Sequence, residues 1–468
     1  MTKPIDLCLL TTVLTILSLP LIADTGSTQA IGCTASSQLP CNCSENNVAG
    51  GHGELIAPCY KGGIQTRTFV QFALFSAWSW SALNWPVSDD YNGPDYDQSL
   101  LTLKGDNSTV WESWKPVDAV FRPDGSAPMP WESRARMLPD SCTRLDVKKI
   151  KDQYGANGTT VPDALPPRLL SDYATAEGTV VVDRNGELVR YETVMNKVAF
   201  DYIVSNNLYH ADGQQTFLEP VNFPDGSRAQ GIRGSYWIKA AWKVLGEEDS
   251  FDDIHKSWAY VYPVFEKGTM LSGCQFRPVG LIGLHVIYKL KNAPKWAWAT
   301  FEHTRNAPTW NELPYAQEKQ YLLYDSNCDE NCAAINSEPK LFPSHGQGPQ
   351  HSQLIRQQRH GYGFDFSRNT SINIKQINDE WKTRLKDSVW SNYRLKGTQW
   401  EDDDQSINPK ILANTAIEPY NQSTSSCMDC HRPAAILNQT ATGHFVPNAK
   451  KSDRIFALQK ARPTLIAP

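Results

Sequence analysis

The pattern of apolar and polar positions predicts two helices in the first half of the chain. From Thr68 to Trp85 apolar residues occur on every face, which is typical of a helix buried on all sides. Pro86 ends this helix because the residue before a proline disfavours helical geometry. A membrane helix is the alternative, and the interspersed glutamine and serines favour a core helix. From Asn196 to Leu208 the pattern predicts an amphipathic helix.

A series of β-rich segments follows and predicts a sheet. Val180–Val182 and Leu188–Tyr191 flank Asn185-Gly186, a strong hairpin signal because both turn positions need positive φ. Four runs then follow at short spacing: SYWIKAAWKVL, KSWAYVYPVF, GLIGLHVIYKL and WAWATFEH. We interpret the 15 tryptophans mainly as packing residues of the core and sheet. The predicted fold class is α+β, a single large compact body with an antiparallel, Trp-rich sheet and a C-terminal haem c segment docked onto it.

The pattern also divides the chain into regions. A Cys-, Gly- and Ser-rich start reads as loop-like, and the polar stretch from Cys328 to His360 reads as a long surface loop or a boundary. A helix at Ile377–Val389 and a strand around Tyr393–Trp400 come next. The predicted organisation is a signal peptide at 1–30, a Cys-rich segment at 31–66, an α+β body at 67–330, the loop or boundary at 331–360 and a C-terminal haem c attachment region at 361–468.

The composition is that of a globular chain with a sizeable core. Hydrophobic residues make up 40% of the 468 residues, charged residues make up 20%, and the net charge is −5. No basic field of the kind that binds nucleic acid is present, so nucleic acid is excluded as a partner.

The first residues predict export. Lys3 gives a thin positive region, Leu7–Ala23 is apolar, and Thr28-Gln29-Ala30 supplies small residues at the cleavage positions. An uncleaved anchor is the alternative, although the apolar run is short for a membrane span. A lipoprotein site at Cys33 is less favoured because Ala30 stands where a larger aliphatic residue is usual. We expect a periplasmic or secreted protein with no stable membrane span after signal cleavage.

The cysteine count agrees with export. Of 11 cysteines, Cys8 leaves with the signal, and Cys427 and Cys430 belong to a motif described next. The eight others predict four disulfides whose pairing the sequence does not fix: Cys33, Cys41, Cys43, Cys59, Cys142, Cys274, Cys328 and Cys332. The alternative is a four-thiolate zinc site in which Cys41 and Cys43 join the motif cysteines.

The stretch SSCMDCHRPA places Cys427, Cys430 and His431 in a C-x-x-C-H arrangement. Covalent haem attachment needs these residues at this spacing, because the two thiols add to the vinyl groups and the histidine reaches the iron. The sequence therefore predicts one covalent haem c, with His431 as the proximal axial ligand.

The second axial position has no obvious ligand. Met428 lies inside the motif and no methionine follows His431, so the usual downstream methionine is absent. We expect either an exchangeable sixth site or a histidine ligand, although sequence distance alone leaves the upstream Met129, Met137, Met195 and Met270 open. Three histidines are candidates: His444, the only one downstream, and His285 and His303, which lie in consecutive β-rich runs and for which a hydrogen-bonded core role is the alternative.

Several stretches resemble a known family. ALNWP, WESWK, KAAWKVL, VGLIGLHVIYKL with WATFEH, and ILANTAIEPY with SSCMDCH are similar to a largely uncharacterised family of exported bacterial mono-haem c-type cytochrome proteins. The resemblance runs from about Phe69 to the C-terminus. It implies haem c at Cys427, Cys430 and His431, and it transfers no catalytic residue.

Two classes of function follow. One is an electron carrier with both axial positions filled, acting with a redox partner protein. The other is a haem c-dependent oxidoreductase of peroxidase or oxygenase type, in which an open iron acts on a small-molecule substrate. The size of the upstream body favours the enzyme, whereas the sequence contains no recognisable distal acid–base pair. A haem sensor or a module that binds aromatic or polymeric ligands is a third alternative.

Overall fold

The computed structural model describes most of the chain after residue 68. The described residues are 69–464 except 92, 96–97, 99, 101–107, 157–167, 227–233, 248, 251, 267–268, 291–292, 329, 342–347, 358–367, 403 and 441–442. The predicted signal peptide, the Cys-rich segment at 31–66 and the cysteines Cys33, Cys41, Cys43 and Cys59 lie outside these residues.

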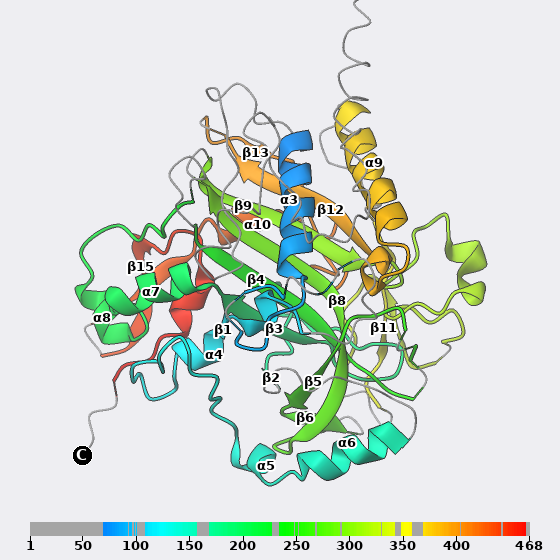
Figure 1. The fold of residues 1–468 in the computed structure, drawn as a ribbon, viewed down its shortest axis with the longest axis horizontal. Coiled ribbons are helices and arrows are strands. Elements are labelled where there is room, and N and C mark those ends of the chain that lie inside the picture. Colours follow the sequence, from blue (N-terminus) through cyan, green and yellow to red (C-terminus); the bar gives the residue numbers. More distant parts are fainter. Residues whose placement is uncertain are drawn as a thin grey trace, which may run out of the picture.

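One large sheet organises the described part of the chain (Figure 1). Its nine strands are antiparallel apart from the β2–β5 pair, and their main order is β1-β3-β4-β8-β9-β12-β13, with β5 beside β8. This sheet, together with the helices, confirms a mixed α+β fold with a large antiparallel sheet. The strands are β1 Lys115–Pro116, β2 Arg168–Leu170, β3 Arg190–Met195, β4 Tyr236–Val244, β5 Lys256–Val261, β8 Gln275–Leu290, β9 Ala293–His303, β12 Tyr393–Glu401 and β13 Ile407–Asn408.

In the described part of the chain, helices and three small two-stranded sheets accompany the large sheet. The pairs are β6 Val264–Glu266 with β7 Thr269–Leu271, β10 Cys332–Ile335 with β11 His351–Gln353, and β14 Ala435–Gln439 with β15 Phe445–Lys451. The α-helices are α3 Phe69–Leu83, α4 Val117–Val120, α5 Asp140–Thr143, α6 Val147–Ala156, α7 Lys197–Ser205, α8 Ala211–Thr216, α9 Arg368–Arg384 and α10 Cys427–His431. The 3-10 helices are η2 Trp111–Ser113, η4 Leu313–Glu318, η5 Val389–Asn392 and η6 Phe456–Lys460.

The alternation of side chains along the strands gives the sheet two different faces. On β9, Ala297, Ala299 and Phe301 face the core that α3 and α9 cover, where Trp80 of α3 stacks on Phe301 at 4.4 Å. Trp296 and Trp298 of β9 belong to a second core with α7 and the C-terminal residues. Each of these two tryptophans is no more than 2% exposed, so they pack the sheet as the sequence predicts.

Most elements were predictable. The helix at 68–85 is confirmed as α3 and the one at 196–208 as α7. The turn at Asn185-Gly186 is present between the bridged residues Val182 and Leu188, but only Gly186, at φ 81°, has the positive φ that we expected at both positions. The four β-rich runs are confirmed, although the second divides into β5 and β6. The predicted helix at 377–389 is displaced, since α9 runs from Arg368 to Arg384. The stretch at 331–360, predicted as a loop, contains the short parallel pair β10–β11, which gives no periodic signal.

Two disulfides are present in the described part of the chain. Cys142 pairs with Cys274 at a Cα–Cα distance of 5.0 Å, and Cys328 pairs with Cys332 at 6.0 Å. They account for four of the eight cysteines that we expect to be paired. Among the described helices, none has the length and apolarity that crossing a membrane requires.

Candidate functional site

The C-x-x-C-H motif forms the short helix α10, which lies against β12. Ser426 precedes the helix, and its hydroxyl accepts a hydrogen bond from the Asp429 amide at 3.3 Å, as is usual at a helix N-terminus. The Met428 amide donates to the Gln399 side chain of β12 at 2.8 Å. Gln399 pairs in register with Trp298 of β9, so the motif is fixed over these two strands.

The contacts of His431 fix its protonation. Its Nδ1 lies 2.8 Å from the carbonyl oxygen of Arg454. A carbonyl oxygen can only accept, so Nδ1 carries the proton and the neutral ring keeps a lone pair on Nε2. The ring packs between Trp298, at 4.3 Å between centroids, and Phe456, at 5.1 Å. A metal-binding histidine is held in this way, with one nitrogen donating to a carbonyl and the other free.

An unusual backbone conformation presents the carbonyl that His431 uses. Asp453 and Arg454 have φ of 52° and 67°, in the left-handed region that L residues other than glycine rarely adopt. The Trp296 indole donates to the Asp453 carbonyl at 2.7 Å, and the Arg454 guanidinium pairs with Glu401 and donates to the Met428 carbonyl. Strained residues persist where their surroundings hold them, and they cluster at functional sites.

Burial controls the charge of the motif. It lowers the pKa of His431 to about 4, so the imidazole is neutral at pH 7. Burial also raises the pKa of Cys427 well above its ordinary value, and it raises the pKa of Cys430 with a further contribution from Glu418. Both groups are therefore thiols at neutral pH. A dithiol redox centre needs a lowered thiol pKa, so this environment argues against one.

A polar group lies on the face of the sheet that carries the motif. Lys239 of β4 and His285 of β8 are register partners, and His285 Nε2 is 3.3 Å from Glu418 Oε2. Burial would raise the pKa of Glu418, but the charge of His285 and other contacts outweigh it and lower the pKa. The charges of Lys239, His285 and Glu418 also act on the pKa of His431, which burial chiefly lowers.

The loop that carries Glu418 is fixed to the sheet by Asn414. The Asn414 amide group donates to Thr300 Oγ1 at 2.8 Å and to the Phe301 carbonyl at 2.7 Å. Its backbone amide donates to Glu418 Oε2 at 2.9 Å. Gly283 makes the approach possible, because a Cβ there would lie 3.0 Å from Asn414 Oδ1. The carboxylate beside His285 is thus rigidly placed.

Comparisons of the chain with protein-family models, with curated proteins and with solved structures give no match. The assignment of this site therefore depends on its own residues.

The structure separates the three candidate distal histidines. His285 lies on the face that carries the motif. His303 lies on the opposite face, where Nε2 is 2.9 Å from the Asp253 carbonyl and Nδ1 accepts from the Arg305 amide at 3.2 Å. Both its nitrogens are engaged, as in a hydrogen-bonded core residue. His444 is exposed at the turn between β14 and β15. The five residues of β14 span about 16 Å, and this strand separates His444 from the motif along the chain.

The four upstream methionines are also placed in part. Met129 and Met137 are exposed on the surface, at 49% and 52%, and Met195 is fully buried in the core that contains α7. The side chain of Met270 lies outside what the structure describes.

The alternative of a four-thiolate zinc site lies in part outside the described residues, because these do not include Cys41 and Cys43. Among the described residues, the ligand atoms of Cys427, Cys430 and His431 do not gather within 4.8 Å, as a tetrahedral zinc site requires. Haem instead needs the imidazole apart from the thiols. The indole N–H groups of Trp237 and Trp298, on the same face, are buried without a hydrogen-bond partner in the described part of the chain. Haem carboxylates are acceptors that suit such donors.

Sequence reasoning identified the motif but missed its surroundings. Lys239, Glu418 and Arg454 are far from the motif in the chain or carry no motif of their own. Only the tertiary fold brings them together, and no local periodicity signals them.

Proposed function

We propose that the chain is an exported mono-haem c protein with a redox function, and that Cys427, Cys430 and His431 hold the haem. The observation that carries the proposal is the neutral His431, whose Nδ1 is bound to the Arg454 carbonyl and whose Nε2 keeps its lone pair inside a C-x-x-C-H motif. Haem c when bound supplies one-electron chemistry at iron. Because haem is attached to such motifs outside the bacterial cytoplasm, the proposal includes a periplasmic or secreted location.

Each residue of the site has a role in this proposal. The thiols of Cys427 and Cys430 would form the thioethers, and Nε2 of His431 would bind the iron. Trp237 and Trp298 would offer their indole N–H groups to the haem carboxylates. The predicted C-terminal region 361–468 would then hold the haem on the face of the sheet formed by β4, β8, β9 and β12.

The first prediction tests covalent attachment. Protein produced with a haem c maturation system should stay coloured after denaturation and after acid–acetone extraction, because thioether bonds survive both treatments. The intact mass should exceed that of the mature chain by one haem. Complete loss of colour into the acetone phase would refute haem c, and a b-type haem protein treated in parallel is the control.

The surroundings of His285, His303 and His444 favour an exchangeable sixth ligand position on the proposed haem iron. The nitrogens of His303 are engaged on the other face, and His444 is exposed at a hairpin turn. His285 lies on the face of the sheet that carries the motif, but its Nε2 faces Glu418. This pair could take up and return a proton on that face, which is what an oxidoreductase acting on peroxide or an organic donor requires. We therefore favour the enzyme over the electron carrier.

The second prediction separates the two classes. Reduced protein should bind carbon monoxide readily, and His285→Ala should lower peroxide turnover by roughly 10²–10⁴-fold, the usual contribution of a general acid–base residue. Carbon monoxide binding should be retained in this variant. His444→Ala serves as the control and should match the parent.

Other spectra would contradict the second prediction. The parent could instead show a low-spin bis-histidine spectrum that does not change when carbon monoxide is added. If only His285→Ala then binds carbon monoxide, the protein is an electron carrier. A methionine-to-iron charge-transfer band would refute both classes, since our prediction excludes a thioether ligand.

A further inference from the structure

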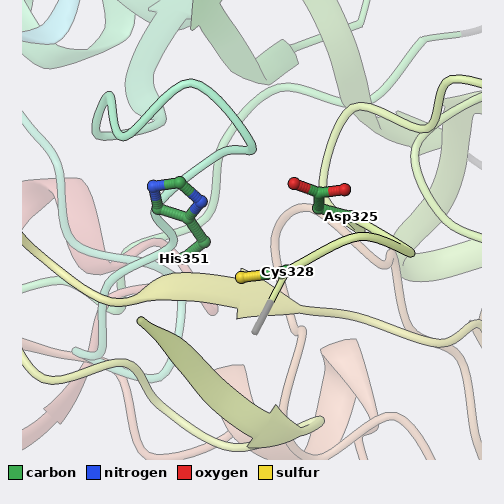
Figure 2. Close-up of side chains that lie close together, drawn as sticks. All are labelled: Asp325, Cys328 and His351. Atoms are coloured by element: carbon green, nitrogen blue, oxygen red, sulfur yellow. The ribbon is translucent and has the colours of Figure 1, made fainter. Parts of the chain in front are cut away.

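A second group of ligand-type side chains lies where β10 and β11 meet. Figure 2 shows Asp325, Cys328 and His351, with the imidazole and the carboxylate on either side of the sulfur. One ligand atom from each of the three residues lies within 4.8 Å of the others. All three residues are half-buried. None of them belongs to the haem site proposed above, so the inference that follows does not depend on it.

A fourth ligand-type residue is adjacent. Cys332 begins β10 and is the register partner of His351, which begins β11. The His351 amide donates to the Asn331 carbonyl at 2.9 Å, so the two strands are held together at this point. In the structure the Cys332 sulfur is bonded to Cys328. Two sulfurs, one imidazole and one carboxylate therefore meet at one place.

The imidazole and the carboxylate each have an atom available. Nδ1 of His351 is buried and has no hydrogen-bond partner in the described part of the chain. Its Nε2 faces the hairpin turn, because a Cβ on Gly186 would lie 3.6 Å from it. Asp325 uses Oδ1 to accept from the Asn327 amide at 2.9 Å, which leaves Oδ2 for a cation. A buried nitrogen without a partner needs an explanation, and a ligand supplies one.

We propose that reduction of the Cys328–Cys332 disulfide converts this group into a binding site for one Zn²⁺. A dithiol reductant supplies two electrons and two protons, is itself oxidised to a disulfide, and leaves two cysteine thiols. Zinc binding then releases the two thiol protons. The ligands are the thiolates of Cys328 and Cys332, Nδ1 of His351 and Oδ2 of Asp325, a four-coordinate set that zinc accepts. A disulfide sulfur is a poor ligand, so the oxidised form does not bind the ion at this site.

The consequence is a redox-dependent cross-link. In the oxidised form the disulfide closes the short loop between Cys328 and Cys332 by itself. In the reduced form zinc closes the same loop and also ties it to β11 through His351 and to the preceding turn through Asp325. The two states therefore hold the same segment by different bonds.

The test uses the full-length mature protein, reduced with a water-soluble phosphine that is oxidised to its phosphine oxide. Zinc is titrated against a chromophoric chelator, and Co²⁺ absorption reports tetrahedral thiolate coordination. The reduced parent should bind one more ion per chain than the variant Cys328→Ser/Cys332→Ser. This variant keeps all other cysteines, so it measures the zinc that they bind. His351→Gln and Asp325→Asn should each lower the affinity for this ion by about 100-fold or more. Even the loss of a residue that only supports a metal ligand lowers metal affinity by roughly 10–100-fold.

Matched controls separate metal binding from misfolding. Asp404 makes the same turn contact as Asp325, since its Oδ1 accepts from the Ser406 amide at 2.9 Å, so Asp404→Asn should bind zinc like the parent. Circular dichroism of the oxidised variants establishes that each is folded. Equal zinc stoichiometry and affinity in the parent and in all variants would overturn the proposal, as would an equal extra ion in the oxidised parent.

Discussion

Replacement of both Cys427 and Cys430 with serine is expected to abolish covalent haem attachment. Serine hydroxyls do not form thioethers with haem vinyl groups, so no bond to the chain remains. Each single variant should retain at most one thioether and a lower haem content. The measurement is haem staining of a denaturing gel, together with the intact mass of the protein.

A second pair of cysteines provides the control for this result. Cys328→Ser/Cys332→Ser removes the same number of sulfurs from another place and should keep its covalent haem. His431→Ala should keep the thioethers but change the iron spectrum, because it removes the proximal nitrogen and not the thiols. Retention of haem mass by the Cys427→Ser/Cys430→Ser chain would contradict the assignment of the motif.

The sequence predicted those elements whose signals are local. The helix α3 is apolar on every face, and α7 is capped by the preceding Asn196, whose side chain accepts a hydrogen bond from the Ala199 amide. The long strands β8 and β9 have β-branched and aromatic runs. The short connection between β8 and β9 predicted that they are adjacent in the sheet, and the pairing of His285 with Thr300 confirms this prediction. The periodicity of apolar residues and the residues that cap helix ends determine these features.

The parts that the sequence did not predict depend on contacts between distant residues. His285 and His303 looked equivalent in the sequence, but the register of β8 and β9 places them on opposite faces of the sheet. The Arg454 carbonyl that holds His431 belongs to a left-handed turn stabilised by β9 and β12. One residue of register decides which face a side chain occupies, and the pattern of apolar residues does not fix that.

The buried ion network around Arg168 is another feature that no motif signals. Arg168 of β2 lies 2.8 Å from Glu192 and 3.0 Å from Glu112, and His255 Nε2 lies 3.0 Å from Glu112. The guanidinium also lies over the Trp242 ring at 4.6 Å. Arg168 is 3% exposed and Glu112 is 4% exposed, so water screens neither charge.

Replacement of Arg168 with methionine is expected to lower the free energy of unfolding at pH 7 by about 3–5 kcal/mol. The variant keeps much of the apolar volume but removes the guanidinium that Glu112 and Glu192 share, which leaves His255 beside Glu112 and the more distant Arg136 beside Glu192. An unpaired buried charge costs more than the pair contributes, which is why the loss is large. Urea unfolding followed by tryptophan fluorescence measures it. A loss below about 1 kcal/mol, typical of surface ion pairs, would contradict this interpretation of the network.

The dependence of this loss on pH identifies its cause. Burial raises the pKa of Glu112, but the charges of His255 and Arg168 outweigh burial and lower it from 4.5 to about 2. Because the pKa is lower in the folded state, the carboxylate stabilises the fold fully above its unfolded pKa of 4.5 and loses this effect as the pH falls through about 2. Without Arg168 the folded-state pKa rises, so Glu112 of the variant is protonated at higher pH and its cost is relieved. The difference in unfolding free energy between parent and Arg168→Met should therefore shrink by about 1 kcal/mol or more from pH 7 to pH 4, since a tenfold change in a protonation equilibrium corresponds to roughly 1.4 kcal/mol.

A second buried arginine shows whether packing alone explains the effect. Arg190 is 1% exposed, and its guanidinium donates to the carbonyls of Tyr262 and Pro263, which do not titrate. The carboxylates of Glu187 and Asp172 also act on the pKa of Arg190. The destabilisation by Arg190→Met should therefore change with pH, but less than that by Arg168→Met, whose guanidinium lies within 3.0 Å of two carboxylates. If both variants show the same pH dependence, the loss at Arg168 comes from packing and not from its carboxylates. A loss that shrinks in acid more for Arg168→Met than for Arg190→Met establishes that Arg168 keeps its neighbouring carboxylates ionised.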